Sequence, residues 1–172
     1  IDVIYVVVPT GLHAKYAIKA ANAGKHVWCE KPMAKTSEEC RQIIEACNKN
    51  GVKLSIGYRM QHEKNTQTLM KWAETKPFGK MKNLKAEAGY YGDPMNPWKL
   101  EKEMGGGAMY DMGVYPLNAA RYTTGLEPIS VSAKHIINRP EIFDEVDETT
   151  VFDLEFPNGI TANCRTSFGE SM

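Results

Sequence analysis

The sequence lacks an excess of charge of one sign, because its 172 residues carry 21 Lys and Arg against 21 Asp and Glu. A neutral chain has no long-range field that would gather nucleic-acid phosphates or an anionic membrane surface. It also lacks a long hydrophobic run, and Val3–Val8 is far shorter than the roughly 20 residues that span a bilayer. We therefore expect neither a nucleic acid nor a membrane as a partner.

Metal-binding patterns are absent as well. The four cysteines form no C-x-x-C pair, and the four histidines are scattered without ligand spacing. Cys40 and Cys47 lie seven residues apart, on one face of an expected helix, which suits small core residues. We therefore expect no metal site and cysteines that serve the core.

No phosphate-binding fingerprint occurs in the chain, neither G-x-G-x-x-G after a strand nor a P-loop. The run Gly105–Gly107 does not match either motif and instead predicts a close-packed entry to a helix. Ile1 begins directly on a strand pattern, without an initiator Met or a signal segment. We expect a piece of a longer protein, which leaves the localisation open between cytoplasm and periplasm.

Residues 1–57 alternate between strand and helix patterns. We expect strands at 2–8, 26–29 and 52–56 and helices at 12–22 and 36–48. Short connections between such elements require a parallel sheet whose strands are covered on both faces. Ligands bind beyond the carboxyl ends of these strands, which carry Pro9-Thr10, Glu30-Lys31-Pro32 and Gly57-Tyr58-Arg59.

The pattern changes after Arg59. We expect helices at 63–74 and from the triple glycine to about 125, and strands at 81–91, 129–137, 148–155 and 160–168. The turn Pro157-Asn158-Gly159 joins the last two strands as a hairpin. Successive strands without intervening helices favour an antiparallel sheet. The chain is therefore predicted to combine part of an α/β unit with an α+β domain.

Lys31 is the first candidate for chemistry. It follows a short strand and precedes Pro32, which confines the residue before it to extended conformations. An ammonium held in this way can donate to a substrate hydroxyl or carbonyl and stabilise an oxyanion. The alternative is an ordinary surface lysine in a loop.

Asp111 and Tyr115 form the second candidate pair. Four residues apart on a helix, they share one face, where a carboxylate beside a phenol can act as an acid/base pair. Pro116 cannot donate to the Met112 carbonyl and disfavours helical geometry at Tyr115, so we expect a kink there. Kinks also occur at bends without a function, and that alternative stays open.

Three further side chains lie in suggestive places. Trp98, beside Lys99, either walls a sugar or nicotinamide site or anchors a proline-rich loop in the core. Arg59, at a strand end, could meet a phosphate or a carboxylate.

Taken in order, these motifs resemble the glucose–fructose oxidoreductase/inositol dehydrogenase/rhizopine catabolism (Gfo/Idh/MocA) family over nearly the whole chain. The resemblance is carried by Pro9-Thr10 and His13, then Glu30-Lys31-Pro32-Met33-Ala34, Gly57-Tyr58-Arg59, Trp98-Lys99, Gly105-Gly106-Gly107, Asp111, Gly113, Tyr115 and Val146-Asp147-Glu148-Thr149. It is closest to the glucose–fructose oxidoreductase branch, in which tyrosine replaces the histidine of inositol dehydrogenases. The glycine-rich fingerprint that opens family members is missing.

The resemblance implies the C-terminal part of a dinucleotide-binding Rossmann domain at 1–57. It implies a substrate and oligomerisation domain of α+β class at 58–172, with a large, mostly antiparallel sheet that we expect to continue beyond Met172. It implies that Lys31, Asp111 and Tyr115 are catalytic, with Asp111 orienting the substrate and Tyr115 as acid/base. The residues implied to bind the cofactor are Pro9, Thr10, His13, Glu30, Lys31, Arg59, Trp98 and Lys99.

The implied activity is hydride transfer between the nicotinamide of NADP or NAD and a carbon of a sugar or polyol, with the fragment itself inactive. Two alternatives remain: a non-catalytic sugar- or cofactor-binding protein on the same scaffold, and an NAD-dependent glycoside-cleaving enzyme. An open sheet face commonly packs against another subunit, so we expect a homo-oligomer formed through the antiparallel sheet. The sugar and the choice between NAD and NADP cannot be inferred from these motifs.

Overall fold

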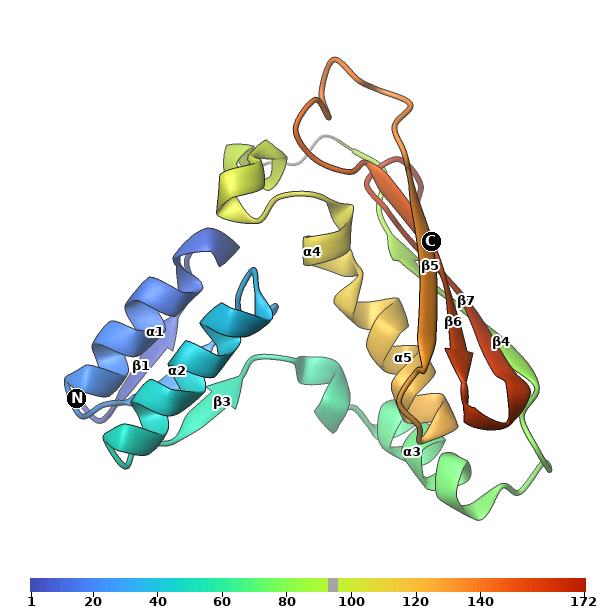
Figure 1. Cartoon of the computed structure of the whole chain (residues 1–172), viewed down its shortest axis with the longest axis horizontal. Helices are drawn as coiled ribbons and strands as arrows, with labels where there is room; N and C mark the ends of the chain where they lie inside the picture. The colour runs from blue at the N-terminus through green and yellow to red at the C-terminus, as the bar shows by residue number, and fades with distance from the viewer. Residues whose placement is uncertain (93–95) are drawn as a thin grey trace. The chain divides into compact units, whose positions relative to one another are not determined.

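The computed structural model describes residues 1–92 and 96–172, which form two compact units (Figure 1). The first unit comprises Ile1–Tyr58 and Asn96–Gly106, and the second comprises the rest. Asn96–Gly106 falls within the domain expected at 58–172, whereas in the structure this segment clusters with the first unit. The proline-rich loop expected around Trp98 lies partly outside the described residues.

The first unit is built on a parallel sheet of order β1-β2-β3. Its elements are β1 (Val3–Val6), α1 (His13–Asn22), β2 (His26–Cys29), α2 (Ser37–Lys49) and β3 (Leu54–Ile56), with a 3-10 turn η1 (Thr10–Leu12) before α1. A capping box begins α2, because Thr36 accepts from the Glu39 N–H while Glu39 accepts from the Thr36 N–H. The predicted α/β order is confirmed element by element.

Both helices of this unit contribute to one core, and the other face of the sheet is exposed. Val6, Val27 and Cys29 are buried together with apolar residues of α1 and α2. Strand residues of the opposite parity are exposed: Val3, Tyr5, Val7 and Trp28. Successive right-handed crossovers toward one edge place both helices on the same face. The prediction that both faces are covered is therefore wrong for the described chain.

The segment Asn96–Gly106 lies against the turn that follows β1. It forms two 3-10 turns, η3 (Pro97–Leu100) and η4 (Lys102–Met104). A Cβ on Gly11 would lie 2.6 Å from the carbonyl oxygen of Glu103, so only glycine allows this approach. Lys35 extends to the same place, where its Nζ donates to the Glu103 carbonyl at 2.7 Å.

The second unit contains a four-stranded sheet of order β4-β7-β6-β5. Its strands are β4 (Asn83–Gly89), β5 (Ser130–Ile136), β6 (Thr149–Phe156) and β7 (Ile160–Ser167). β5–β6 and β6–β7 are antiparallel, whereas β4 runs parallel to β7. The expected hairpin turn is present as η5 (Pro157–Gly159), with Asn158 in the left-handed region. A mostly antiparallel sheet is thus confirmed.

In the described part of the second unit, three helices accompany the sheet. They are α3 (Lys64–Thr75), preceded by the 3-10 turn η2 (Arg59–His62), then α4 (Ala108–Met112) and α5 (Val114–Thr124). The helix expected after the triple glycine is broken earlier than predicted. The break falls at Gly113, three residues before Pro116. Because proline cannot donate to the carbonyl four residues earlier, the helix is interrupted before that position. Asp111 and Tyr115 consequently lie on two successive helices.

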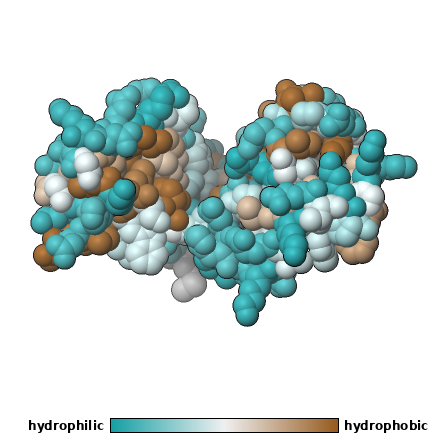
Figure 2. All heavy atoms as spheres, turned by 90° about the horizontal axis from the view of Figure 1, so that it is seen from below, coloured by the Kyte–Doolittle hydropathy of each residue, from teal (hydrophilic) through white to brown (hydrophobic). Residues whose placement is uncertain are grey.

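The core of the second unit lies between α5 and the sheet. Ala120 of α5 packs with aromatic and aliphatic residues of β6 and β7, among them Phe152, Leu154, Phe156 and Cys164. Hydrophobic side chains also reach the molecular surface, brown among teal polar ones in Figure 2. No helix in the described part of the chain combines the length and the hydropathy needed to cross a bilayer.

Candidate functional site

The carboxyl end of β1 carries three of the expected cofactor residues. Pro9 begins the turn η1, and Thr10 and His13 are buried, with His13 only 1% exposed. The His13 Nε2 lies 2.9 Å from the Val8 carbonyl oxygen, and its Nδ1 lies 2.8 Å from the Pro32 carbonyl oxygen. His13 therefore links the ends of β1 and β2, and its ring nitrogens face the protein's own backbone.

Glu30 and Lys31 follow β2. One carboxylate oxygen of Glu30 accepts the hydroxyl of Tyr5, and the other accepts the backbone N–H of Lys31 at 3.2 Å. The Tyr5 ring stacks on Trp28, with centroids 4.5 Å apart. The hydrogen bond to Glu30 raises the pKa of the Tyr5 phenol above its ordinary value. The Glu30 carboxylate is thus held beside the main chain of Lys31.

At the end of β3, the backbone of Gly57 lies close to the Glu30 carboxylate. A Cβ on Gly57 would lie 3.0 Å from Glu30 Oε1 and 3.3 Å from the indole nitrogen of Trp28. Because glycine has no Cβ, it leaves room for the Glu30 carboxylate at this position. Arg59, which we expected near the cofactor, is exposed in η2 at the start of the second unit.

Trp98 and Lys99 lie in η3 of the first unit. Both are partly buried, and the Lys99 ammonium lies 5.9 Å from the Trp98 ring centroid. The glycines that follow pack closely, as predicted: a Cβ on Gly106 would lie 2.4 Å from the Lys99 carbonyl oxygen. The choice between a site wall and a loop anchor for Trp98 stays a prediction.

Asp111 and Tyr115 belong to the second unit, where both are partly buried on α4 and α5. The N–H of Asp111 donates to the Gly107 carbonyl at 3.2 Å, in the first turn of α4. Lys31 belongs to the first unit. The structure therefore brings together His13, Glu30 and Lys31 on one unit, and Asp111 and Tyr115 on the other.

A buried ion pair anchors the segment between β5 and β6. Glu148, 1% exposed, accepts from Nε of Arg139 at 2.7 Å and from the backbone N–H groups of Asn138 and Arg139. Burial alone would raise the pKa of this carboxyl. The guanidinium and the two N–H groups outweigh burial, and the net pKa lies below its ordinary value.

The cysteines occupy the cores, as expected. Cys29, Cys47 and Cys164 are buried and Cys40 is partly buried, and all four are free thiols. Burial raises the pKa of Cys29 to about 12 and that of Cys164 to about 11. In the described residues, no group of three or more His, Cys, Asp or Glu side chains is arranged to hold a metal ion.

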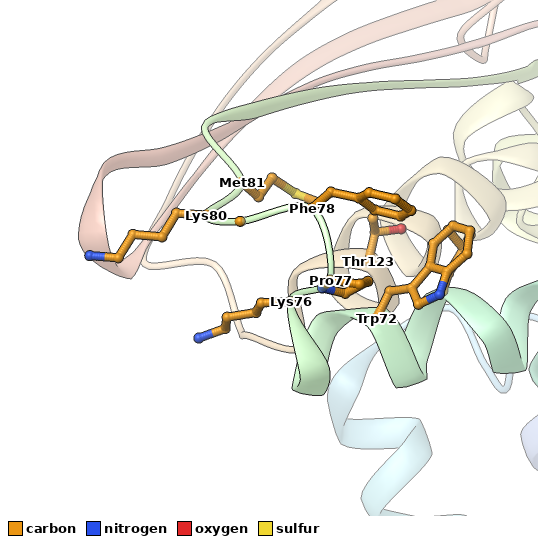
Figure 3. A pocket seen from close by; sticks show the side chains of 9 residues that line it. Trp72, Lys76, Pro77, Phe78, Lys80, Met81 and Thr123 are labelled. Carbon is orange, nitrogen blue, oxygen red and sulfur yellow. The ribbon is translucent and has the colours of Figure 1, made fainter.

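Two adjoining cavities, of about 150 and 560 Å³, lie where α3 and α5 end in the second unit. Figure 3 shows Trp72, Phe78 and Thr123 gathered on one side, while Lys76 and Lys80 extend the other way. None of the residues expected to be catalytic or cofactor-binding lines either of these cavities.

Two contacts near the expected residues were not predicted from the sequence. Tyr5 and Trp28 are register partners on adjacent parallel strands, and Glu30 follows Trp28 by two residues. The period of two along the strand could have revealed that these side chains share a face. Asp147 contacts the entry to α4, a contact between residues distant in sequence that no local pattern reveals.

A parallel sheet with motifs at its strand ends, followed by an α+β unit, is the architecture of oxidoreductases of the Rossmann class. Residues 1–58 match the family model described as "Oxidoreductase family, NAD-binding Rossmann fold", and residues 66–171 match the model of the "GFO/IDH/MocA C-terminal domain". The chain belongs to the Gfo/Idh/MocA family, which confirms the resemblance inferred from its motifs.

Individual relatives agree with this assignment. The chain is 31% identical to the D-xylose 1-dehydrogenase [NADP(+)] of Haloarcula marismortui, over 96% of this chain and 48% of that protein. The aldose-aldose oxidoreductase from Caulobacter crescentus, solved in complex with glycerol, is 40% identical with a TM-score of 0.93, over 99% of this chain and 52% of the other. An NAD-binding protein from Listeria innocua is 28% identical with a TM-score of 0.88, covering all of this chain and 50% of that protein. The chain thus spans about half the length of the relatives it matches.

Proposed function

We propose that the whole protein is an NAD(P)-dependent oxidoreductase that transfers a hydride between the nicotinamide and a carbon of a sugar or polyol. The family supports the oxidoreductase class, and the D-xylose dehydrogenase and aldose-aldose oxidoreductase support a sugar as substrate. The proposal concerns the whole protein because the chain covers about half of these relatives. For the chain by itself we propose no turnover, since its sequence holds no glycine-rich turn for a pyrophosphate.

The observation that carries the proposal is the arrangement at the carboxyl ends of β1 and β2. His13 links the two strand ends, and Glu30 is held by Tyr5 and by the N–H of Lys31. Ligands of open α/β sheets bind beyond this edge. A carboxylate and an ammonium on consecutive residues fit the hydroxyls and the carboxamide of a nicotinamide riboside.

The cofactor, when bound, supplies or accepts the hydride at its nicotinamide ring. In the oxidation direction we assign to Tyr115 the removal of the hydroxyl proton and to Lys31 the stabilisation of the oxyanion that results. Asp111 accepts a hydrogen bond from a second hydroxyl and so orients the sugar. Thr10, Pro9 and Glu30 line the cofactor's side of the strand ends in this proposal. His13 contributes by fixing the loop that follows β2, and Arg59, Trp98 and Lys99 complete the cofactor's surroundings.

The proposed role of Lys31 is tested by replacing it with Met in the whole protein. We expect kcat with the best sugar substrate to fall by about 10²–10³-fold, while the Kd of NAD(P)H, measured by fluorescence, changes little. Lys49→Met, on an exposed residue at the end of α2, is the matched control. Equal losses of turnover and cofactor affinity would show that Lys31 is a cofactor ligand instead.

Product analysis tests the reaction itself. Incubation with free sugars and with glycosides should give an oxidised sugar and reduced cofactor in equal amounts. Release of an aglycone without net reduction would identify a glycoside-cleaving enzyme. Binding of sugar and cofactor without turnover would identify a non-catalytic protein on the same scaffold.

We also propose that the whole protein forms a homo-oligomer through the sheet of the second unit. The sheet face opposite α5 is exposed and polar, and it alternates charges along neighbouring strands, including Lys85, Glu87, Lys134, Asp153 and Glu155. Faces with both signs of charge can pair with a second copy related by a two-fold axis. Light scattering of the whole protein, with and without Asp153→Lys, tests this assembly.

A further inference from the structure

The entry to α4 has no capping side chain of its own. Gly107 precedes the helix and, as glycine, has no side chain that could cap it. The first N–H groups of a helix have no partner within it, and leaving them unsatisfied is costly where water is excluded. Gly107 and Ala108 are buried, so these donors need acceptors from elsewhere in the fold.

Asp147, about forty residues further along the chain, supplies these acceptors. Its carbonyl oxygen accepts from the Ala108 N–H at 3.0 Å, and its carboxylate Oδ2 accepts from the Met109 N–H at 2.9 Å. The hydroxyl of Thr166 donates to the Ala108 carbonyl at 3.0 Å and fixes the same residue from β7. A negative charge at this end also interacts favourably with the helix dipole.

Gly107 and Asp147 require one another. Gly107 has φ +99°, and a Cβ at that position would lie 2.1 Å from Asp147 Oδ1. Only glycine therefore lets the carboxylate approach the helix entry this closely. The third glycine of the triple glycine run has a specific purpose, which is to admit Asp147.

The carboxylate of Asp147 is itself held in place. Its Oδ2 accepts from the Thr150 hydroxyl at 2.6 Å, and that hydroxyl lies 2.8 Å from the Nδ1 of His135 on β5. The next residue, Glu148, is buried and bound to Arg139, and its carbonyl accepts from the Phe168 N–H at 2.8 Å. The Asp147 carboxylate is thus held through Thr150 of β6 and His135 of β5, next to a residue that is itself anchored.

We infer that Asp147 is a positioning residue for the catalytic helix pair, an inference that rests on the proposed function of Asp111. Asp111 follows Met109 by two residues, and its N–H makes the first bond of α4, to Gly107. By fixing Gly107, Ala108 and Met109, the Asp147 carboxylate sets the rotation of α4 and hence the direction in which Asp111 projects. Asp147 does not touch the substrate in this account.

Two variants and one control test the inference. Asp147→Ala removes the side-chain acceptor, whereas Asp147→Asn keeps one carbonyl oxygen that can accept from Met109. Asp144→Ala is the matched control, because Asp144 is an exposed aspartate three residues before Asp147. Hydrogen exchange of the 172-residue chain is followed by mass spectrometry on peptides that cover 105–113. Turnover and cofactor affinity are measured on the whole protein.

In Asp147→Ala we expect the amides of α4 to exchange about fivefold faster or more, because a capping hydrogen bond is lost. We expect kcat to fall about 10²-fold with the Kd of NAD(P)H unchanged, because the substrate-orienting residue is displaced. Asp147→Asn should restore most of the protection from exchange and most of kcat, whereas Asp144→Ala should alter neither. Unchanged exchange in Asp147→Ala would overturn the inference, as would an Asn variant that is as impaired as the Ala variant in a folded protein.

The exchange measurement also separates this inference from the proposed function. If the whole protein oxidises no sugar, the proposed function fails, yet faster exchange of α4 in Asp147→Ala still shows that Asp147 fixes the helix entry. If the protein is active and exchange rises while kcat stays constant, Asp147 caps the helix without positioning Asp111, and the inference fails alone.

Discussion

The Tyr5 hydroxyl donates to the Glu30 carboxylate across two neighbouring parallel strands, so the residue before Lys31 is held from β1 as well as from its own loop. The same carboxylate accepts from the Lys31 N–H. The hydroxyl of Tyr5 therefore helps to fix the conformation of the loop after β2. This loop lies at the sheet edge where the cofactor is proposed to bind.

Tyr5→Phe removes this hydrogen bond and keeps the ring that stacks on Trp28. We expect NAD(P)H to bind the whole protein about threefold to tenfold more weakly, as for the loss of one hydrogen bond. Fluorescence titration measures the affinity. Tyr16→Phe, at an exposed tyrosine of α1, is the control and should bind as the unchanged protein does. An affinity that is unchanged in Tyr5→Phe would contradict a role for the Tyr5–Glu30 bond.

The hydrogen bond between Tyr5 and Glu30 should stabilise the folded chain less at high pH. The pKa of Tyr5 is raised above its ordinary value of 10.0 by the hydrogen bond to Glu30. Because the folded pKa exceeds the unfolded one, the contribution to stability is complete below pH 10 and is lost as the pH rises through the folded value. Spectrophotometric titration should show that Tyr5→Phe lacks the phenol that ionises late. A titration identical to that of the unchanged chain would refute this.

Glu148 should make the second unit sensitive to acid. Its folded pKa lies below the ordinary value of 4.5, so its contribution is complete above that value and is lost as the pH falls through the folded pKa. Urea unfolding from neutral pH to pH 3 should therefore show a loss of stability that is smaller in Glu148→Gln. Glu141→Gln, on an exposed glutamate of the same loop, should keep the dependence of the unchanged chain.

Replacing Arg139, the partner of Glu148, should lower the free energy of unfolding more than neutralising Glu148 does. Arg139→Met leaves a buried carboxylate without its guanidinium, and we expect the free energy of unfolding to fall by about 3–5 kcal/mol at neutral pH. The double variant Arg139→Met/Glu148→Gln should regain part of that loss, because the unpaired charge is gone. A double variant that is less stable than Arg139→Met would contradict this account of the pair.

Gly107→Ala should destabilise the chain through two effects, a left-handed backbone and a collision with Asp147. Gly159→Ala serves as the control, because Gly159 has φ +73° and no atom within 4 Å of its hypothetical Cβ. We expect about 1 kcal/mol from the backbone effect in both variants, and about 1–3 kcal/mol more in Gly107→Ala from the collision. Thermal unfolding of both variants measures the difference. Equal losses would show that Asp147 can move aside.

The thiols should be slow to react in the folded chain. The thiolate is the reactive form, and the pKa of Cys29 is raised to about 12 and that of Cys164 to about 11 by burial. At neutral pH we expect alkylation of the partly buried Cys40 first and of Cys29 and Cys164 last, as read by mass spectrometry. In denaturant all four should react alike. Early modification of Cys29 in the folded chain would contradict its burial.

Local patterns predicted most of the fold. Alternation of strand and helix up to residue 57, the capping box at Thr36 and the hairpin at Pro157–Gly159 are determined by residues close together in sequence, and each is present in the structure. The break in the helix was expected at Tyr115 and lies at Gly113, because a proline disturbs the whole turn before it. The assignment of Asn96–Gly106 could not be predicted, since it depends on the packing of a loop onto η1.

By itself the sequence determined the order of the elements, because this follows from local patterns along the chain. The resemblance of its motifs gave the family and implied the proposed roles of Lys31, Asp111 and Tyr115. Only the tertiary structure decided what holds their segments: Tyr5 against Glu30, His13 between two strand ends, and Asp147 at the helix entry that Gly107 leaves open. Hydrogen bonds between residues far apart in sequence depend on strand pairing and helix packing. Their partners therefore become visible only once the chain has folded.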